Sequence, residues 1–207
     1  MIPRPIVTVA VLAVVLATAA CTAAPTASSP PPASAAAGGD CPTAQPAPLG
    51  AGESREVTIA TDLGSMTLTI EADLSPIAAG NFVALASCGF YDGVVFHRVV
   101  PGFVIQGGDP TGTGTGGPGY TIKDEPVSAE YARGIVAMAR TPAPDSVGSQ
   151  FFIVLDDEAR GSLAQANTYQ IIGTVSAGME TVDAIAAAAD AELPSNPVTM
   201  TDVTVAP

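Results

Sequence analysis

From residue 53 to the C-terminus, the chain is a succession of short apolar runs separated by glycine and proline, which limits its fold more than any other feature. Residues 56–61 and 65–70 alternate apolar and polar side chains, so each predicts a strand with one buried face. Asp62-Leu63-Gly64 between them predicts a tight turn and therefore a hairpin. Further strands are expected at residues 94–99, 103–106, 135–139, 151–155, 169–175 and 198–205.

Only two helices are expected among these strands. Ser75-Pro76 predicts a helix start with the serine as N-cap, and Gly89 predicts its end. A second helix is expected at residues 179–189. Many closely spaced strands with two helices favour a closed or nearly closed antiparallel sheet.

The N-terminal residues are typical of an export signal. Arg4 precedes an apolar run of 12 residues, 6–17, which is too short to span a bilayer but suits a signal peptide. Small residues then lead to Cys21, which resembles the bacterial lipoprotein signal, in which the cysteine is lipidated. We expect a signal peptide at residues 1–20, a lipid anchor on Cys21 and a location at the outer face of the cell membrane. Ordinary secretion with an incidental Cys21 is the alternative.

Residues 22–52 consist almost entirely of Ala, Pro, Ser, Thr and Gly, and such a segment cannot bury enough apolar surface to order itself. With Cys21 they form an expected anchor and disordered tether, 21–52, before a folded domain at 53–207. The formal net charge of −13 argues against nucleic acid as a partner. A monomer is the default expectation.

Cys41 and Cys88 remain after Cys21 is assigned to lipid. In an oxidising compartment they could form a disulfide that joins the end of the tether to the domain. Two unpaired thiols are the alternative, with Cys88 as a small buried residue at a helix end. The disulfide is the favoured reading.

Polar side chains stand among apolar residues in two runs, 96–109 and 148–153. Arg98, Gln106 and Gln150 are the polar groups, and polar groups on an apolar wall are how small specific sites are usually built. His97 is the one histidine of the chain, which excludes a multi-histidine metal site. As the neighbour of Arg98 in a strand, it should point to the opposite face and be a packed, hydrogen-bonded structural residue.

A site with no nucleophile, metal or general base can still bind and polarise an amide without cleaving it. Rotation of an X–Pro bond requires only that, because its barrier comes from amide resonance. An apolar pocket can hold the proline ring, and a guanidinium hydrogen bond to the pyramidal nitrogen would favour the twisted state. No cofactor is expected. The glycine-rich run 112–117 lacks the Gly-Lys-Ser/Thr ending of a P-loop, so no nucleotide site is expected either.

Several sequence blocks of the domain resemble the cyclophilin family of peptidyl-prolyl isomerases. The blocks, in order, are Phe96-His97-Arg98 with Pro101-Gly102-Phe103, Gln106-Gly107-Gly108-Asp109, Gly114-Thr115-Gly116-Gly117, Met138-Ala139 and Gly148-Ser149-Gln150-Phe151-Phe152-Ile153. The resemblance covers essentially all of residues 53–207. It implies a mainly β fold, a closed eight-stranded antiparallel barrel capped by two α-helices. It also implies a peptidyl-prolyl cis-trans isomerase that binds proline-containing segments and assists folding of exported proteins.

The resemblance assigns a role to each site residue. Arg98, Phe103 and Gln106 match catalytic positions, with Arg98 donating to the proline-side amide and Gln106 contacting the substrate backbone. The walls of the proline pocket would be Phe103, Val104, Phe152 and Leu163, with Tyr169 at the border. The other substrate-binding positions would be Ala139, Arg140, which holds the peptide through its main chain, and, lining the pocket for residues before proline, Gly114, Thr115, Thr141 and Gln150.

Some residues depart from the family pattern. Val104 replaces the methionine of many members, and Tyr169 replaces the histidine of the eukaryotic type. Ser162 falls near the tryptophan of drug-sensitive members, so weak cyclosporin binding with retained catalysis is expected. A binding module or chaperone with little turnover would not need Arg98. An unrelated β-barrel lipoprotein for apolar ligands would leave the Arg98, Gln106 and Gln150 set unexplained.

Overall fold

The structure, a computed structural model, describes Met1 and residues 40–207. Residues 2–39 lie outside the described part of the chain, and with them nearly all of the expected signal peptide, the expected lipid anchor Cys21 and most of the expected tether. Among the described residues, no helix is both long enough and apolar enough to cross a bilayer.

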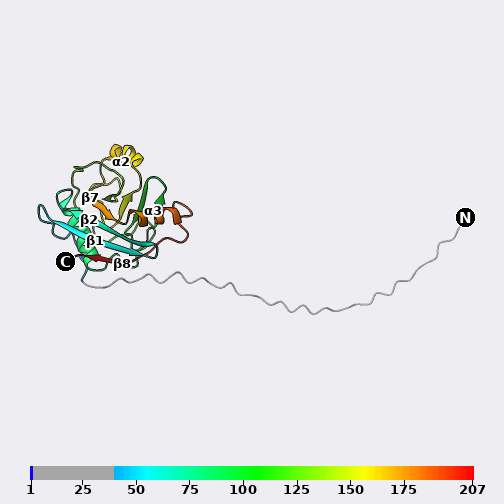
Figure 1. Cartoon of the computed structure of the whole chain (residues 1–207), viewed down its shortest axis with the longest axis horizontal. Helices are drawn as coiled ribbons and strands as arrows, with labels where there is room; N and C mark the ends of the chain where they lie inside the picture. The colour runs from blue at the N-terminus through cyan, green and yellow to red at the C-terminus, as the bar shows by residue number, and fades with distance from the viewer. Residues whose placement is uncertain (2–39) are drawn as a thin grey trace. The chain divides into compact units, whose positions relative to one another are not determined.

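Eight antiparallel strands form one sheet, with the order β3-β4-β6-β5-β7-β2-β1-β8. The strands are β1 (Ser54–Thr61), β2 (Gly64–Glu71), β3 (Arg98–Val100), β4 (Val104–Gly107), β5 (Ile135–Met138), β6 (Phe151–Val154), β7 (Ile171–Ala177) and β8 (Met200–Val205). Figure 1 shows β7, β2, β1 and β8 following one another across the domain. Each predicted strand is confirmed, although β3 is shorter than the predicted 94–99.

The expectation of a closed barrel is wrong, because β3 and β8 do not pair along their lengths and the sheet is open. Val95, just before β3, makes single bridges to Thr199 and to Asp109. The outer edge of β3 is covered instead by a loop, where the Val99 amide donates to the Glu192 carbonyl at 2.8 Å. A strand of three residues is too short to complete a ladder, so a loop protects this edge.

Three α-helices are present among the described residues: α1 (Pro76–Ser87), α2 (Arg160–Ala166) and α3 (Met179–Ala188). Helices α1 and α3 confirm the two predicted helices. Helix α2 corrects the expectation of two helices, and it follows a 3₁₀ turn, η1 (Asp157–Ala159), in a segment where the sequence predicted no helix or strand. Leu163 is the one buried residue of α2, so the segment has no apolar periodicity that could have predicted it.

The N-terminus of α1 is capped differently from the prediction. Ser75 occupies the N-cap position, but its side chain makes no capping hydrogen bond. The carboxylate of Glu125 accepts from the amides of Ile77 and Ala78, each at 2.9 Å. A carboxylate from 47 residues away in sequence therefore satisfies amides that a local serine was expected to satisfy.

Two apolar clusters lie on the two faces of the sheet. The larger contains the inward residues of β1 and β2 with those of α1 and α3, such as Leu68, Phe82 and Ile185. The smaller contains Val104, Phe152 and Leu163, so it joins β4 and β6 to α2. Strands β5 and β6 are buried throughout, because one cluster covers each of their faces. Their unbroken apolar sequences follow from this double burial.

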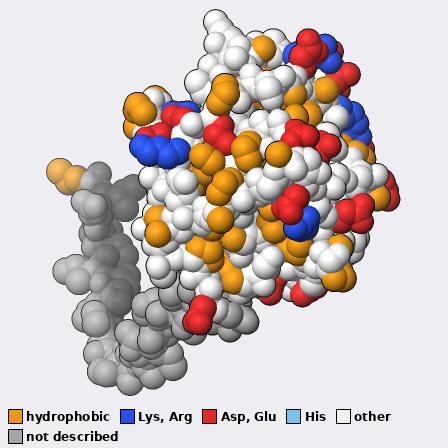
Figure 2. Space-filling view, turned by 90° about the vertical axis from the view of Figure 1, so that its left-hand side faces the viewer, with side chains coloured by type: hydrophobic (Ala, Val, Ile, Leu, Met, Phe, Trp, Pro, Cys, Tyr) orange, Lys and Arg blue, Asp and Glu red, His pale blue; other side chains and the backbone are white. Residues whose placement is uncertain are grey.

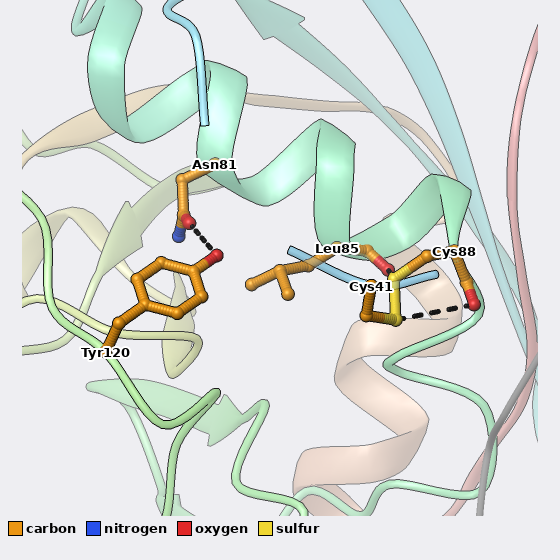
Figure 3. Close-up of a disulfide and its surroundings, with 5 residues drawn as sticks. All are labelled: Cys41, Asn81, Leu85, Cys88 and Tyr120. Atoms are coloured by element: carbon orange, nitrogen blue, oxygen red, sulfur yellow. Dashed lines mark hydrogen bonds between the residues drawn. A yellow bond between two sulfur atoms is a disulfide. The ribbon is translucent and has the colours of Figure 1, made fainter. Parts of the chain in front are cut away.

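The folded part begins before the predicted boundary at residue 53. Cys41 forms a disulfide with Cys88, which follows α1, and the favoured pairing is thereby confirmed (Figure 3). The Leu49 amide donates to the Pro76 carbonyl at 3.0 Å, and Leu49 packs against the larger core. A Cβ atom at Gly80 would lie 2.5 Å from the Ala47 carbonyl oxygen, so the glycine allows this segment to pack directly against the backbone of α1. The segment 41–50 is part of the domain and not tether.

Candidate active site

Arg98, Gln106, Phe152 and Ala137 lie in one row across four strands. The register pairs Arg98 of β3 with Gln106 of β4, Gln106 with Phe152 of β6, and Phe152 with Ala137 of β5. Directly opposite residues in an antiparallel sheet have side chains on the same face. The sheet therefore brings the predicted arginine and glutamine onto the face that carries the smaller apolar cluster.

The residues predicted to form the proline pocket lie together in this cluster. Val104, Phe152 and Leu163 are almost fully buried, and Phe103 and Tyr169 are partly buried against them. The ring of Phe152 meets that of Tyr169 edge-on, with 5.3 Å between centroids and 86° between planes. Leu163 comes from α2, so the helix that the sequence did not predict supplies one wall.

Tyr131 supports this pocket and was missed from the sequence. It is buried in the smaller cluster, and its hydroxyl donates to the Tyr169 carbonyl at 2.8 Å and accepts from the Tyr169 amide at 3.2 Å. Burial raises the pKa of Tyr131 to about 12, so the phenol stays neutral and can hold both bonds. An isolated tyrosine between Glu130 and Ala132 gives no periodic signal, which is why the sequence did not reveal it.

An open groove of about 620 Å³ lies beside the pocket. All four residues predicted to read the positions before proline line it, as do Gln106, Ala139 and Arg140. These four residues are Gly114, Thr115, Thr141 and Gln150. The structure thus brings these residues together in one groove, and Gln106 joins the groove to the row of strand residues beside the smaller apolar cluster. Their individual roles remain predictions.

One buried carboxylate, Asp109, shapes the glycine-rich wall of the groove. It is fully buried and accepts from the amides of Thr111, Gly114 and Gly116 at 2.7, 2.6 and 3.0 Å. Burial acts to raise the pKa of Asp109, but hydrogen bonds from Gly116, Thr111 and Gly114 outweigh it and hold that pKa at about 2. The wall is therefore built around a permanent negative charge and not around a bound phosphate.

Gln150 connects the row of Arg98, Gln106, Phe152 and Ala137 to this wall. Its side-chain amide donates to the carbonyls of Gly114 and Gly116 at 3.0 and 2.9 Å, and its carbonyl accepts from Gln106 at 2.9 Å. Two further side chains hold the backbone just before Gln150 by hydrogen bonds. Tyr91 donates to the Ser149 carbonyl at 2.9 Å, and Asn81 donates to the Gly148 carbonyl at 2.8 Å.

Asn81 in turn accepts from the hydroxyl of Tyr120, a groove residue, at 2.7 Å (Figure 3). One side chain of α1, that of Asn81, therefore fixes both Gly148 and Tyr120, which line the groove.

The side chain of Arg140 has a larger part than expected. Its guanidinium pairs with Asp124 at 2.8 Å and donates to the carbonyls of Thr141 and Ala143 at 3.1 and 2.7 Å. The backbone amides of Asp124 and Asp145 each donate to the side-chain carboxylate of the other residue at 2.9 Å. The side chain is only 10% exposed, so it holds the far wall of the groove together from within.

His97 is buried as predicted, at 5% exposure, but the expectation that it is hydrogen-bonded is wrong. Neither ring nitrogen has a hydrogen-bond partner among the described residues. Burial lowers the pKa of His97 from its ordinary value, against the opposing influence of the Asp109 charge. A neutral imidazole can tolerate this site, which agrees with a structural residue.

Arg98 is one-third exposed beside Gln106 in the row, and its Nε donates to the Glu192 carboxylate at 2.8 Å. A guanidinium, two linked glutamine amides and an apolar pocket can bind a peptide around proline and polarise its amide. The described residues of the site supply no hydrogen-bonded nucleophile and base pair. The chemistry that this arrangement can support is rotation about a bond and not cleavage.

Comparisons with known proteins agree with this geometry. The family model described as "Cyclophilin type peptidyl-prolyl cis-trans isomerase/CLD" matches residues 56–205. The Bacillus subtilis peptidyl-prolyl cis-trans isomerase B is 47% identical over 117 residues, which are 54% of this chain and 78% of that protein. A Streptococcus pyogenes putative bifunctional phosphatase/peptidyl-prolyl cis-trans isomerase is 50% identical over 103 residues, 48% of this chain but only 22% of that longer protein.

Solved structures give the same result. A crystal structure of a Cryptosporidium parvum cyclophilin-type isomerase matches with a TM-score of 0.67 at 33% identity, covering 75% of this chain and 99% of that one. The same protein in the presence of the dipeptide Ala-Pro matches with a TM-score of 0.66 at 34% identity, covering 73% of this chain and 99% of that one. The chain therefore belongs to the cyclophilin family, and its folded domain is a peptidyl-prolyl cis-trans isomerase.

Proposed function

We propose that this isomerase acts outside the cytoplasm, accelerating X–Pro rotation in exported proteins while anchored to the outer face of the membrane through Cys21. The observation that carries the catalytic part is the row in which Arg98 and Gln106 stand beside the pocket of Phe103 and Phe152. The proposed compartment is supported by the Cys41–Cys88 disulfide, since disulfides persist in oxidising surroundings, and by the signal-like N-terminus.

In this proposal the proline ring enters the pocket of Val104, Phe152 and Leu163, and the residues before proline follow the groove past Gln150. A relative crystallised in the presence of Ala-Pro supports a proline-bearing ligand for this fold. Gln106 holds the substrate backbone while an Arg98 N–H donates to the proline nitrogen. That bond strengthens as the nitrogen loses conjugation, so it stabilises the twisted state over both planar states.

The catalytic role of Arg98 is tested by comparing the wild-type chain with Arg98→Ala in an NMR exchange assay on an Ala-Pro peptide. Removal of one transition-state donor is expected to lower turnover by about a hundredfold or more. Arg55→Ala is a matched control, since Arg55 is also an exposed, ion-paired strand arginine, and it lies on β1 away from the row. Equal rates for wild type and Arg98→Ala would remove the catalytic assignment.

The second candidate is a binding module or chaperone that holds proline segments with little turnover. The breadth of the groove beside the pocket favours binding of an extended segment. Peptide binding without exchange in the wild-type protein would support this function over the first.

The anchoring part has its own test. Cys21→Ala in the full chain, expressed in a bacterium that processes lipoproteins, should move the protein from the membrane fraction to the medium. A membrane fraction that is unchanged by the substitution would show that Cys21 carries no anchor.

A further inference from the structure

Glu192 lies against the proposed catalytic arginine although it is 94 residues away in sequence. Its carboxylate accepts from Arg98 Nε at 2.8 Å, and its main-chain carbonyl accepts from the Val99 amide, also at 2.8 Å. The backbone bond fixes Glu192 beside the residue next to Arg98. The loop that covers the edge of β3 therefore places Glu192 next to Arg98. The ion pair does not depend on a chance meeting of two mobile surface side chains.

The contact uses one donor of the guanidinium and leaves the others. An arginine carries five N–H donors, one on Nε and four on the two terminal nitrogens. Within the described residues, Arg98 donates from Nε alone. Glu192 therefore restrains the plane of the guanidinium from its inner nitrogen, while the terminal N–H groups remain for a substrate in the row with Gln106.

The ion pair between Arg98 and Glu192 contributes little to the stability of the fold. The side chains of Arg98 and Glu192 are 33% and 60% exposed, and exposed pairs contribute about 0–1 kcal/mol. All six basic side chains of residues 40–207 pair with a carboxylate, and Figure 2 shows basic side chains lying close to acidic ones on the face drawn. The Arg98 pair differs from the rest because its cation stands in the row with Gln106 and Phe152.

We propose that Glu192 is a positioning residue, which orients the Arg98 guanidinium toward the proline amide before substrate binds. This inference rests on the proposed role of Arg98. Misplacing a catalytic donor by about 1 Å can cost up to a hundredfold in rate, so even a loosened guanidinium should turn over more slowly. A carboxylate or carboxamide at this position can accept the Nε–H, whereas alanine cannot.

The test compares Glu192→Ala and Glu192→Gln in the full chain, with kcat and KM for an Ala-Pro peptide measured by NMR exchange. We expect Glu192→Ala to lower kcat about tenfold with KM changed less than about twofold. Glu192→Gln should retain at least about half of the wild-type kcat. Asp183→Ala is the control, since Asp183 forms a similarly exposed pair with Arg133 at 2.7 Å on α3, and it should leave kcat unchanged.

A second readout follows the arginine directly. In the free protein, the ¹⁵Nε–H resonance of Arg98 should be resolved and slow to exchange in the wild type and Glu192→Gln, and lost in Glu192→Ala. An unchanged resonance in Glu192→Ala, or a kcat equal to or above that of the wild type, would overturn the proposal. If Arg98→Ala retains full activity, it is the catalytic assignment of Arg98 that fails. If Arg98→Ala is inactive but Glu192→Ala is normal, only the positioning role fails.

Discussion

The apolar pocket and the polar groove adjoin on one face of the sheet, but they are built in different ways. The pocket uses side chains of regular strands, such as Val104 and Phe152, whose burial gives both its shape and its stability. The groove is built from irregular loops whose backbone is held by a few polar side chains, above all Asp109, Arg140 and Gln150. Packing can define a hydrophobic surface, whereas a surface of backbone groups must be held by hydrogen bonds.

Substitution in the pocket should have the largest effect on stability. Phe152→Ala removes a side chain that is 4% exposed, so the free energy of unfolding should fall by about 3–5 kcal/mol. Urea unfolding of the wild type and variant measures this. Phe103→Ala, at a partly buried position of the same pocket, should cost clearly less. Similar losses for the two would show that the pocket is not the packed unit described above.

Asp109→Asn should have the next largest effect and should act on the groove. The asparagine keeps the shape of the side chain but loses the negative charge to which the amides of Thr111, Gly114 and Gly116 donate. The free energy of unfolding should therefore fall by about 2 kcal/mol. Amide hydrogen exchange should accelerate in residues 111–117 more than in β4 or β6. Uniform acceleration across the sheet would contradict the separation of groove from pocket.

Arg140→Ala should lower the free energy of unfolding by about 1–2 kcal/mol, since it removes a buried guanidinium and leaves the partly exposed carboxylate of Asp124 without its ion-pair partner. It should nevertheless raise KM for peptides extended before proline, because residues 140–147 lose their internal anchor. A tetrapeptide and a dipeptide substrate, measured side by side, separate the two effects. An unchanged KM for both would favour the sequence-based expectation that Arg140 holds the peptide through its main chain.

Near neutral pH, a change of pH should have the smallest effect on the free energy of unfolding. The pKa of Asp109 is about 2 in the folded protein against an ordinary value of 3.8. A lowered folded pKa means that the contribution is fully present above about pH 4 and is lost as the pH falls toward 2. Unfolding monitored at pH 5, 3.5 and 2.5 should show this loss, with a shallower fall for Asp109→Asn. Equal slopes for both proteins would place the acid sensitivity in other carboxylates.

The pocket could be predicted from the sequence to a greater extent than the groove, because apolar runs are visible locally in the sequence whereas hydrogen bonds between distant segments are not. Phe152 and Val104 sit in short continuous apolar runs that predict strands, so their placement required only the register. Glu125, Asp124 and Glu192 carry no local pattern, because a surface carboxylate reads the same whether it caps a distant helix or lies in solvent. Each was recognised only through a partner far away in the sequence, namely Ile77, Arg140 and Arg98.

The sequence by itself predicted eight strands, the helices α1 and α3, and a set of candidate site residues, because apolar patterns and the family blocks are local properties. Only the tertiary structure decided that the sheet stays open at β3, that α2 supplies Leu163, and that the domain begins at the Cys41–Cys88 disulfide. It also decided that Arg98 is held by Glu192. Each of these depends on contacts between segments that are far apart in the chain.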